Sequence, residues 1–251
     1  MVVLLLVTGC TPGQADDEAA ASTTAPVLGD CRVLTPEDIA KPDNDSPVVD
    51  CAAEHTAETF AIGSFPDDIR ADVGSRELGA YVYRTCKQQF GRFLGGEEST
   101  VMRSMFTWAW FRPSPAAWDQ GARWYRCDVV GGGEQSKQLL ELPRTAKGLL
   151  LGRPDDRWMV CADGSTVSGS VKISCSEPHT WRAVTTIVLG KEGDAYPGDR
   201  VVEVRTRDFC SGSVGAWLNY PVDYDFGYTW FHEAEWKAGN RRSICWARTD
   251  E

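Results

Sequence analysis

The sequence lacks the motifs that would indicate a familiar metal site or hydrolase. Only three of its 251 residues are histidine and no Cys-x-x-Cys pair occurs, whereas structural zinc sites use four close ligands in short-spaced pairs. No Gly-x-Ser-x-Gly motif is present to supply the nucleophile of an α/β-hydrolase. We therefore expect no metal ion, no other cofactor and no catalytic residue that the sequence can name.

Long apolar runs and an excess of basic charge are also missing. The apolar run at the N-terminus is far shorter than the ~20 residues that a transmembrane helix needs. The chain carries 26 Lys and Arg residues against 36 Asp and Glu residues, a formal net charge of −10. Because such a chain has no general basic surface, we expect that it does not bind nucleic acid.

Cysteine, in contrast, is plentiful. Of the nine cysteines, Cys10 stands apart near the N-terminus. The other eight fall into two sets of four, Cys31, Cys51, Cys86 and Cys127, then Cys161, Cys175, Cys210 and Cys245. If the protein folds in an oxidising compartment, this even number of cysteines predicts four disulfide bonds.

The two cysteine sets belong to a pattern that occurs twice. Cys51-Ala52-Ala53-Glu54-His55-Thr56 returns as Cys175-Ser176-Glu177-Pro178-His179-Thr180, and each half closes on Trp-x-x-Gly-x-Arg-x-x-x-Cys, at residues 118–127 and 236–245. Between them, the aromatic run Phe106, Trp108, Trp110 and Phe111 is matched by Phe226, Tyr228, Trp230 and Phe231. Landmarks in the same order at similar spacing predict a duplicated unit.

The pattern of each unit predicts an α+β fold with two homologous, disulfide-stapled repeats, each a small antiparallel sheet with one main helix. In the first repeat we expect a helix start at 35–38, strands at 47–51, 56–64, 106–110 and 124–130, and a helix at 66–94. In the second we expect strands at 158–161, 171–175, 181–189, 226–232 and 242–247, and a helix at 199–218. The expected organisation is a lipoprotein signal (1–10), a flexible tether (11–29), repeat 1 (30–130), an inter-repeat segment (131–157) that packs across both repeats, and repeat 2 (158–251).

Four cysteines in one repeat allow three disulfide pairings, and the cysteine pattern alone leaves all three open. We favour first to second and third to fourth. Cys161 and Cys175 flank a Ser/Gly-rich turn, as the two strands of a hairpin would. Cys86 falls on the apolar stripe of the expected long helix and should be buried.

The N-terminal stretch Val7-Thr8-Gly9-Cys10, which ends an apolar run, looks like a bacterial lipobox. This likeness implies cleavage after Gly9 and acylation of Cys10, which would anchor the protein in the lipid bilayer on the extracytoplasmic face of the cell membrane. The apolar run is short and lacks a preceding positive charge, so we expect that upstream codons supply the rest of the signal. The alternative is a buried strand with an ordinary cysteine.

His55 and His179 are the sharpest functional candidates, with Glu58 and Arg182 as neighbouring candidate binding residues. One interpretation makes each histidine a general base or a ligand contact. The other makes each imidazole a hydrogen-bonded support beside a disulfide. The second is favoured, because the histidine occurs twice whereas Glu58 is replaced by Arg182. These two opposite charges could pair across the repeats or line a groove.

The segments Gly29-Asp30-Cys31, Val49-Asp50-Cys51 with His55-Thr56-Ala57-Glu58, and Trp118-x-x-Gly121-x-Arg123 before Cys127 together resemble the septum-formation family of actinobacterial envelope proteins. The resemblance covers residues 29–250 in two tandem copies. It implies a link to cell division or envelope construction and transfers no catalytic residue. In the second copy, Arg182 departs from the pattern, and Cys161 lacks the preceding Gly-Asp.

We expect a membrane-anchored, exported lipoprotein that binds an envelope protein or cell-wall partner without catalysis. The alternatives are a cell-wall-active enzyme with a cleft between the repeats, and an accessory or sensor subunit of a membrane complex. Arg123 and Arg241, at equal offsets from a glycine turn, should each bind a carboxylate inside the fold. His232 has no counterpart in the first repeat and should lie on the surface.

Overall fold

A computed structural model describes residues 23–66, 76–132 and 138–249. The expected lipobox with Cys10, residues 11–22 of the tether and the start of the long helix at 67–75 therefore lie outside the described residues. The ordered contacts of the first repeat begin inside the expected tether, because the backbone N–H of Gly29 donates to the carbonyl of Thr59 at 2.8 Å.

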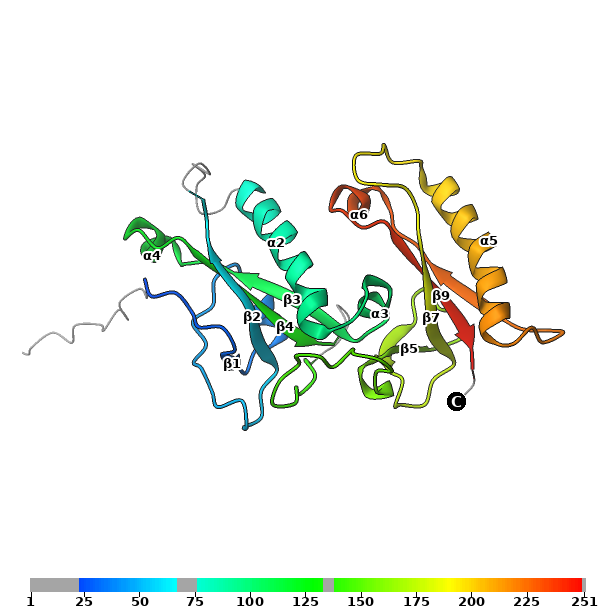
Figure 1. Ribbon diagram of the computed structural model, residues 1–251, viewed down its shortest axis with the longest axis horizontal. Coiled ribbons are helices and arrows are strands. Elements are labelled where there is room, and N and C mark those ends of the chain that lie inside the picture. The colour runs from blue at the N-terminus through cyan, green and yellow to red at the C-terminus, as the bar shows by residue number, and fades with distance from the viewer. Residues whose placement is uncertain (1–22, 67–75, 133–137, 250–251) are drawn as a thin grey trace, which may run out of the picture.

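The protein is built on two antiparallel sheets that lie side by side (Figure 1). The first has the order β1-β2-β4-β3, from β1 (Cys31–Arg32), β2 (Ala57–Ser64), β4 (Trp124–Gly131) and β3 (Phe106–Phe111). The second has the order β6-β5-β7-β9-β8, from β6 (Val171–Ser174), β5 (Val160–Asp163), β7 (Trp181–Val188), β9 (Arg242–Arg248) and β8 (Phe226–Thr229).

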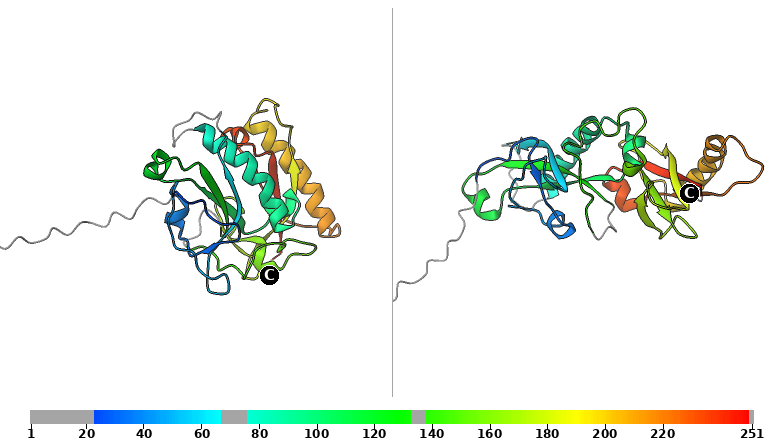
Figure 2. Two further views of the ribbon diagram at one scale, coloured as in Figure 1. Left: turned by 60° about the vertical axis from the view of Figure 1, so that its left-hand side comes forward. Right: turned by 90° about the horizontal axis from the view of Figure 1, so that it is seen from below.

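One long helix covers one face of each sheet, α2 (Arg76–Leu94) on the first and α5 (Asp199–Trp217) on the second (Figures 1 and 2). We call this the helix face of each sheet and the opposite side the back face. Cys86 and Cys210 lie on the buried stripes of the two helices. The α+β architecture expected from the sequence is therefore confirmed. No helix among the described residues combines the length and apolarity needed to cross a membrane.

Shorter helices complete each repeat. They are α1 (Pro36–Ile39), α3 (Glu98–Met102), α4 (Pro115–Asp119), the 3-10 helix η1 (Asp156–Trp158) and α6 (Glu233–Lys237). The expected helix start at Thr35 is confirmed as a capping box, in which the Thr35 side chain and the Asp38 side chain each bind the other's backbone N–H. The helices α3, α4 and α6 were not predicted from the sequence.

The two sheets share their strand registers, which supports the duplication. Cys31 lies opposite Glu58 in the first sheet, and Cys161 lies opposite Arg182 in the second. Both central pairings also carry the same irregularity, between Thr59 and Ala61 in β2 and between Ala183 and Thr185 in β7. A bulge in the same place of two strands is a backbone feature that follows from a common plan.

Four disulfides staple the fold, two in each repeat. They join Cys31 to Cys51, Cys86 to Cys127, Cys161 to Cys175 and Cys210 to Cys245. This is the favoured pairing, first cysteine to second and third to fourth. In each repeat, one bond closes the entry loop, residues 31–51 or 161–175, and the other fixes the long helix to the central strand β4 or β9.

Two predicted features of the repeats are wrong. Residues 47–51 form no strand; only Val49 makes an isolated bridge, to Cys31, because the chain there follows a proline and turns at once. The aromatic runs correspond with a two-residue shift, since Trp110 lies opposite Cys127 and Tyr228 lies opposite Cys245. The match of Trp110 with Trp230 was therefore incorrect.

The inter-repeat segment packs against both repeats, as expected. Leu142, Ala146 and Leu150 join the core under α2, and Leu140 packs against the apolar cluster of the second sheet. The repeats also touch directly, because the backbone N–H of Met105 donates to the carbonyl of Trp158 at 2.8 Å.

Candidate functional site

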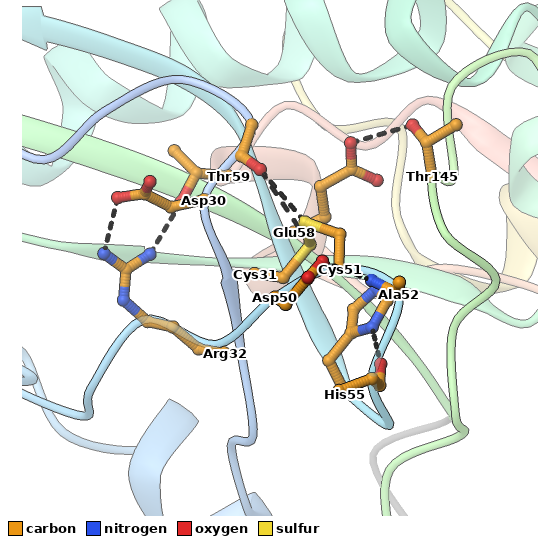
Figure 3. Close-up of a disulfide and its surroundings, with 12 residues drawn as sticks. Asp30, Cys31, Arg32, Asp50, Cys51, Ala52, His55, Glu58, Thr59 and Thr145 are labelled. Carbon is orange, nitrogen blue, oxygen red and sulfur yellow. Dashed lines mark hydrogen bonds and ion pairs between the residues drawn. A yellow bond between two sulfur atoms is a disulfide. The ribbon is translucent and has the colours of Figure 1, made fainter.

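His55 lies at the corner where the chain leaves the first disulfide and enters β2 (Figure 3). Its side chain is buried, with the residue only 2% exposed, and Nδ1 lies 2.8 Å from the carbonyl oxygen of Ala53. A carbonyl oxygen can only accept, so Nδ1 carries the hydrogen. Nε2 is buried and makes no hydrogen bond. The imidazole thus closes a tight turn beside the Cys31–Cys51 bond.

His179 repeats this arrangement beside the Cys161–Cys175 bond. It is 4% exposed, and its Nδ1 lies 2.8 Å from the carbonyl oxygen of Glu177. In both copies the accepting carbonyl belongs to the residue two positions before the histidine. The same local hydrogen bond in two places is typical of a structural support, because neither buried ring is open to a substrate.

Glu58 and Arg182 occupy equivalent register positions but do not pair with each other. Glu58 is 5% exposed, and its carboxylate accepts from the Thr145 hydroxyl at 2.8 Å and from the Ala146 backbone N–H at 2.6 Å. Arg182 instead makes an ion pair with Asp156. The proposed pairing across the repeats is thus wrong. Each side chain holds its own end of the inter-repeat segment.

The glycine-turn arginines also differ from expectation. Arg123 Nη1 donates to the carbonyls of Trp118 at 2.7 Å and Ala122 at 2.8 Å, and its guanidinium lies 4.1 Å from the Trp118 ring centre. Arg241 repeats both the carbonyl contacts and the stacking, on Trp236 at 3.6 Å. No carboxylate is involved in these contacts. Each arginine donates further hydrogen bonds to carbonyls at the C-terminal end of a short helix, α4 or α6.

A buried charged network on the back face of the first sheet was missed by the sequence analysis. Asp128 is fully buried and accepts from the Thr59 hydroxyl at 2.7 Å and from Arg126 Nε at 3.0 Å. Arg32 joins it by donating to Thr59 at 3.0 Å and pairs with Asp30 at 3.0 Å. Figure 3 shows the Arg32 and Asp30 end of this network beside the first disulfide.

Burial governs the electrostatics of this network. It raises the pKa of the Asp128 carboxyl above its usual range, although Arg126, Thr59 and Arg32 each act to lower it. Burial likewise lowers the pKa of Arg126, against the attraction of Asp128. Each charge thus stabilises the other against the effect of burial, and removal of either side chain would leave the other buried without its partner.

A second titratable cluster lies on the surface of the second repeat. His232 Nδ1 lies 3.3 Å from an Asp199 carboxylate oxygen, and the Tyr196 hydroxyl donates to the same carboxylate. Burial and the neighbouring Asp199 raise the pKa of Tyr196 to about 12. The side chains of His232 and Asp199 are more than half exposed, so His232 is a surface residue as expected. A nucleophile does not complete this cluster among the described residues.

The arrangement around the two histidines can therefore support a fold but offers little for chemistry. Across the described residues, no group of three or more His, Cys, Asp or Glu side chains is placed to hold a metal ion. His55, Glu58, His179 and Arg182 are each engaged by their own repeat or by the inter-repeat segment. Their contacts hold the turns that follow Cys51 and Cys175 and the ends of the inter-repeat segment.

Comparison with known proteins gives one family. No curated protein and no solved structure shows a significant match to this chain. The profile of the family described as "Septum formation" matches residues 28–245, which include both long helices, all four disulfides and both sheets except the last three residues of β9. This description indicates a role related to cell division or the cell envelope. The chain belongs to the septum-formation family.

Proposed function

We propose that the protein is an exported, lipid-anchored protein of the extracytoplasmic membrane face that binds an envelope partner, without catalysis, during septum formation. Its folded part would act as a rigid binding body, and acylated Cys10 would hold it at the membrane through the segment 11–29. An accessory subunit of a membrane complex fits the same description, because such a subunit also acts by binding.

The disulfides support the extracytoplasmic address. Four disulfide bonds in one chain are typical of a protein in an oxidising compartment, and each closes a loop that would otherwise be free in the unfolded state. On the chain-entropy description, the loops of 14 to 41 residues correspond to about 3–4 kcal/mol of stability each. A framework of this kind suits a binding body that must keep its shape outside the cell.

The single observation that carries the non-catalytic part of the proposal is the doubled histidine corner. His55 and His179 are both buried, and both use Nδ1 to bind a backbone carbonyl two residues earlier. A general base needs access to its substrate within hydrogen-bond reach. Buried rings that serve the turn beside a disulfide do not have that access.

The histidine corners are tested by substitution of both rings. His55→Gln with His179→Gln keeps a side-chain amide near each carbonyl, whereas the Ala pair leaves each carbonyl without its donor. We expect the Ala pair to lower the free energy of unfolding by about 1–3 kcal/mol per site and the Gln pair by less. Loss of a cellular function with the melting temperature unchanged would instead favour the alternative of a cell-wall-active enzyme.

The binding role is tested in cells. Photo-crosslinking of the full chain in dividing cells, followed by solubilisation of membranes and mass spectrometry, should recover one envelope partner at the septum. The mass of the membrane-extracted protein should show an acylated Cys10. A uniform distribution around the cell with no saturable crosslink would contradict the binding role, and an unmodified Cys10 would contradict the lipid anchor.

A further inference from the structure

The entry loops of the two repeats, which the first disulfide of each repeat closes, differ in length. Cys31 and Cys51 are separated by 20 residues, but Cys161 and Cys175 by only 14. In the first repeat, the longer connection carries α1 and reaches the outer strand β3, where the carbonyl of Pro42 accepts the backbone N–H of Arg112 at 3.0 Å. The first repeat therefore covers part of its own sheet edge.

In the second repeat, the shorter connection stops before it reaches the edge. Its Val167 packs over the back face of β8, so closely that a Cβ at Gly227 would lie 2.5 Å from Val167 Cγ2. β8 is the outer strand of the second sheet, as β3 is of the first. In the described part of the chain, no segment takes the place that Pro42 occupies beside β3.

The backbone of β8 has hydrogen-bonding groups that face outward. Arg248 N donates to the carbonyl of Asp225 at 3.4 Å, and in an antiparallel pair the bonded residues alternate. The N–H and C=O groups of Phe226 and Tyr228 therefore point away from β9, and Trp230, which directly follows the strand, comes next in the same alternation. Such a row of free backbone groups is a template for one more strand.

Trp230 is the register equivalent of Arg112. Each lies two residues beyond the aromatic residue that faces the last cysteine of its repeat, Trp110 or Tyr228. The backbone N–H of Arg112 is held by the Pro42 carbonyl, but across the described residues that of Trp230 has no partner. The edge of β3 in the first repeat is thus covered at this position, whereas the edge of β8 in the second repeat is open at the equivalent position.

A cavity of about 750 Å³ accompanies the open edge. It is lined by β8 with its aromatic side chains, by the hairpin loop 165–168 and by residues of α5 and β9. The corresponding cavity along β3 is smaller, about 450 Å³, and residues 39–42 of the longer connection form one of its walls. The shorter entry loop therefore leaves an open cavity beside the unpaired edge of β8.

The residues that line the cavity along β3 include Lys41 and no carboxylate. The cavity of the second repeat is lined by two carboxylates, Glu203 and Asp225, and by Arg248, which pairs with Asp225 at 3.1 Å. Gly79 stands in the first repeat at the position of Glu203, seven residues before the helix cysteine, and Thr107 stands at the register position of Asp225. The charge therefore belongs to the open edge and not to the shared fold.

We propose that the edge of β8 binds an extended segment of a partner polypeptide, which adds a strand beside Phe226–Trp230 and places a basic side chain against Glu203 and Asp225. Backbone hydrogen bonds would provide the register, and the aromatic side chains of β8 would pack against alternate side chains of the bound segment. This assignment rests on the proposed binding function and names the chemistry of its partner.

The test uses the full chain and a set of blocked nonapeptides that alternate Val and Thr, with either Lys or Glu at one position scanned along the peptide. Amide hydrogen exchange is followed at Phe226, Tyr228 and Trp230. At a free peptide concentration of about ten times its Kd, a Lys peptide should slow exchange at the outward amides by about tenfold. The Glu peptides should give no such protection at equal concentration.

A charge reversal makes the test specific. Glu203→Lys should reverse the preference, so that Glu peptides protect the outward amides and Lys peptides do not. Asp208→Lys, an exposed reversal on the same helix outside the cavity, should leave the Lys preference unchanged. Protection that ignores Glu203→Lys, or no protection by any peptide, would overturn the proposal.

Three further outcomes distinguish this proposal from related ones. If the outward amides become protected as the protein concentration rises without peptide, the edge binds a second copy of this chain and the assignment to a partner is wrong. If the edge binds no peptide while crosslinks at the septum persist, the edge-strand inference fails and the proposed binding function stands. If the edge binds peptide but no septal crosslink forms, the edge-strand inference stands and the proposed binding function at the septum fails.

Discussion

The first repeat is longer than the second in two places, and each extra segment covers a surface. The entry loop spans 20 residues between its cysteines against 14, and the second disulfide spans 41 against 35. The first extension carries α1 over the first sheet's own back face and edge. The second contains α3, which lies against β7 of the second repeat, where the Thr186 hydroxyl donates to Ser99 at 2.9 Å.

The back faces of the two sheets show what this difference does to the sequence. Asp128, Arg126 and Thr59 of the first sheet correspond in register to Trp246, Ile244 and Ala183 of the second. The first face buries these polar side chains under the chain's own N-terminal segment, in which the Asn44 side-chain oxygen accepts from Arg126 Nη2 at 2.7 Å. The second is apolar and packs against Met105 of the first repeat. One framework thus tolerates two opposite interiors.

The largest expected effects come from single substitutions on these two faces. Asp128→Ala leaves the guanidinium of Arg126 buried without its partner and should lower the free energy of unfolding by about 3–5 kcal/mol. Trp246→Ala, which opens a cavity under a side chain that is 1% exposed, should cost a similar about 3–5 kcal/mol. Urea denaturation of each variant measures both.

The double change Arg126→Met with Asp128→Leu distinguishes the two faces. It removes both charges together, so its cost should fall well below that of Asp128→Ala, within about 1–2 kcal/mol of the parent protein. A double variant as unstable as Asp128→Ala would show that side-chain packing, and not the unpaired charge, determines the loss of stability on the first sheet's back face.

Removal of a helix-to-strand disulfide should affect the two repeats almost equally. Ser in place of Cys86 and Cys127, or of Cys210 and Cys245, should each lower the free energy of unfolding by about 4 kcal/mol, because loop entropy depends only weakly on loop length. Thermal unfolding of both variants under non-reducing conditions provides the comparison. A cost confined to one repeat would mean that the two bonds do not play equivalent parts.

Glu58 and Arg182 should differ strongly despite their equivalent positions. Glu58→Ala leaves the Thr145 hydroxyl and the Ala146 N–H without an acceptor in the interior, which should cost about 2–3 kcal/mol. Arg182→Ala breaks an ion pair whose Asp156 side chain is half exposed, which should cost less than about 1 kcal/mol. Chemical denaturation of the two variants measures both costs. Equal losses of unfolding free energy would contradict the prediction that burial determines the cost.

The smallest effect concerns the ion pair between the repeats, in which Arg242 Nε lies 2.8 Å from Glu98. Burial acts to raise the pKa of Glu98, but hydrogen bonding and attraction from Arg242 and Lys87 prevail and lower it. A carboxyl with a lowered folded pKa stabilises the fold above its unfolded pKa of about 4.3 and loses that contribution as the pH falls. Glu98→Gln should therefore cost a few tenths of a kcal/mol at pH 7, because the pair is half exposed, and the difference from the parent should vanish in acid. A difference that persists at pH 2–3 would contradict this origin.

The features that could be predicted from the sequence are those written in nearby residues. Cysteine spacing gave the hairpin at Cys161–Cys175, and the Thr35–Asp38 cap marked a helix start. The charged network could not be predicted, because the bulge after Thr59 decides that Thr59, and not Phe60, meets Asp128. The aromatic runs were matched two residues out of register because the α3 segment enters before β3, and similarity of residue type concealed this insertion.

The candidate residues show the same division. Burial of His55 and His179 beside disulfides follows from their position after a cysteine, so a structural part could be argued in advance. The open edge of β8 could not, because strand order and the reach of a loop are properties of the folded chain. One signal was available: the six-residue difference between the two entry loops, which is visible in the cysteine spacing alone.

The most direct measurement of this account is the amide hydrogen exchange of two equivalent backbone groups in the unbound full chain. Arg112 N–H is held by the Pro42 carbonyl at 3.0 Å, whereas Trp230 N–H has no partner across the described residues. We predict slow exchange at Arg112 and exchange at Trp230 close to that of an unprotected amide. Equal protection of the two amides would contradict the claim that the second repeat leaves open the edge that the first repeat fills.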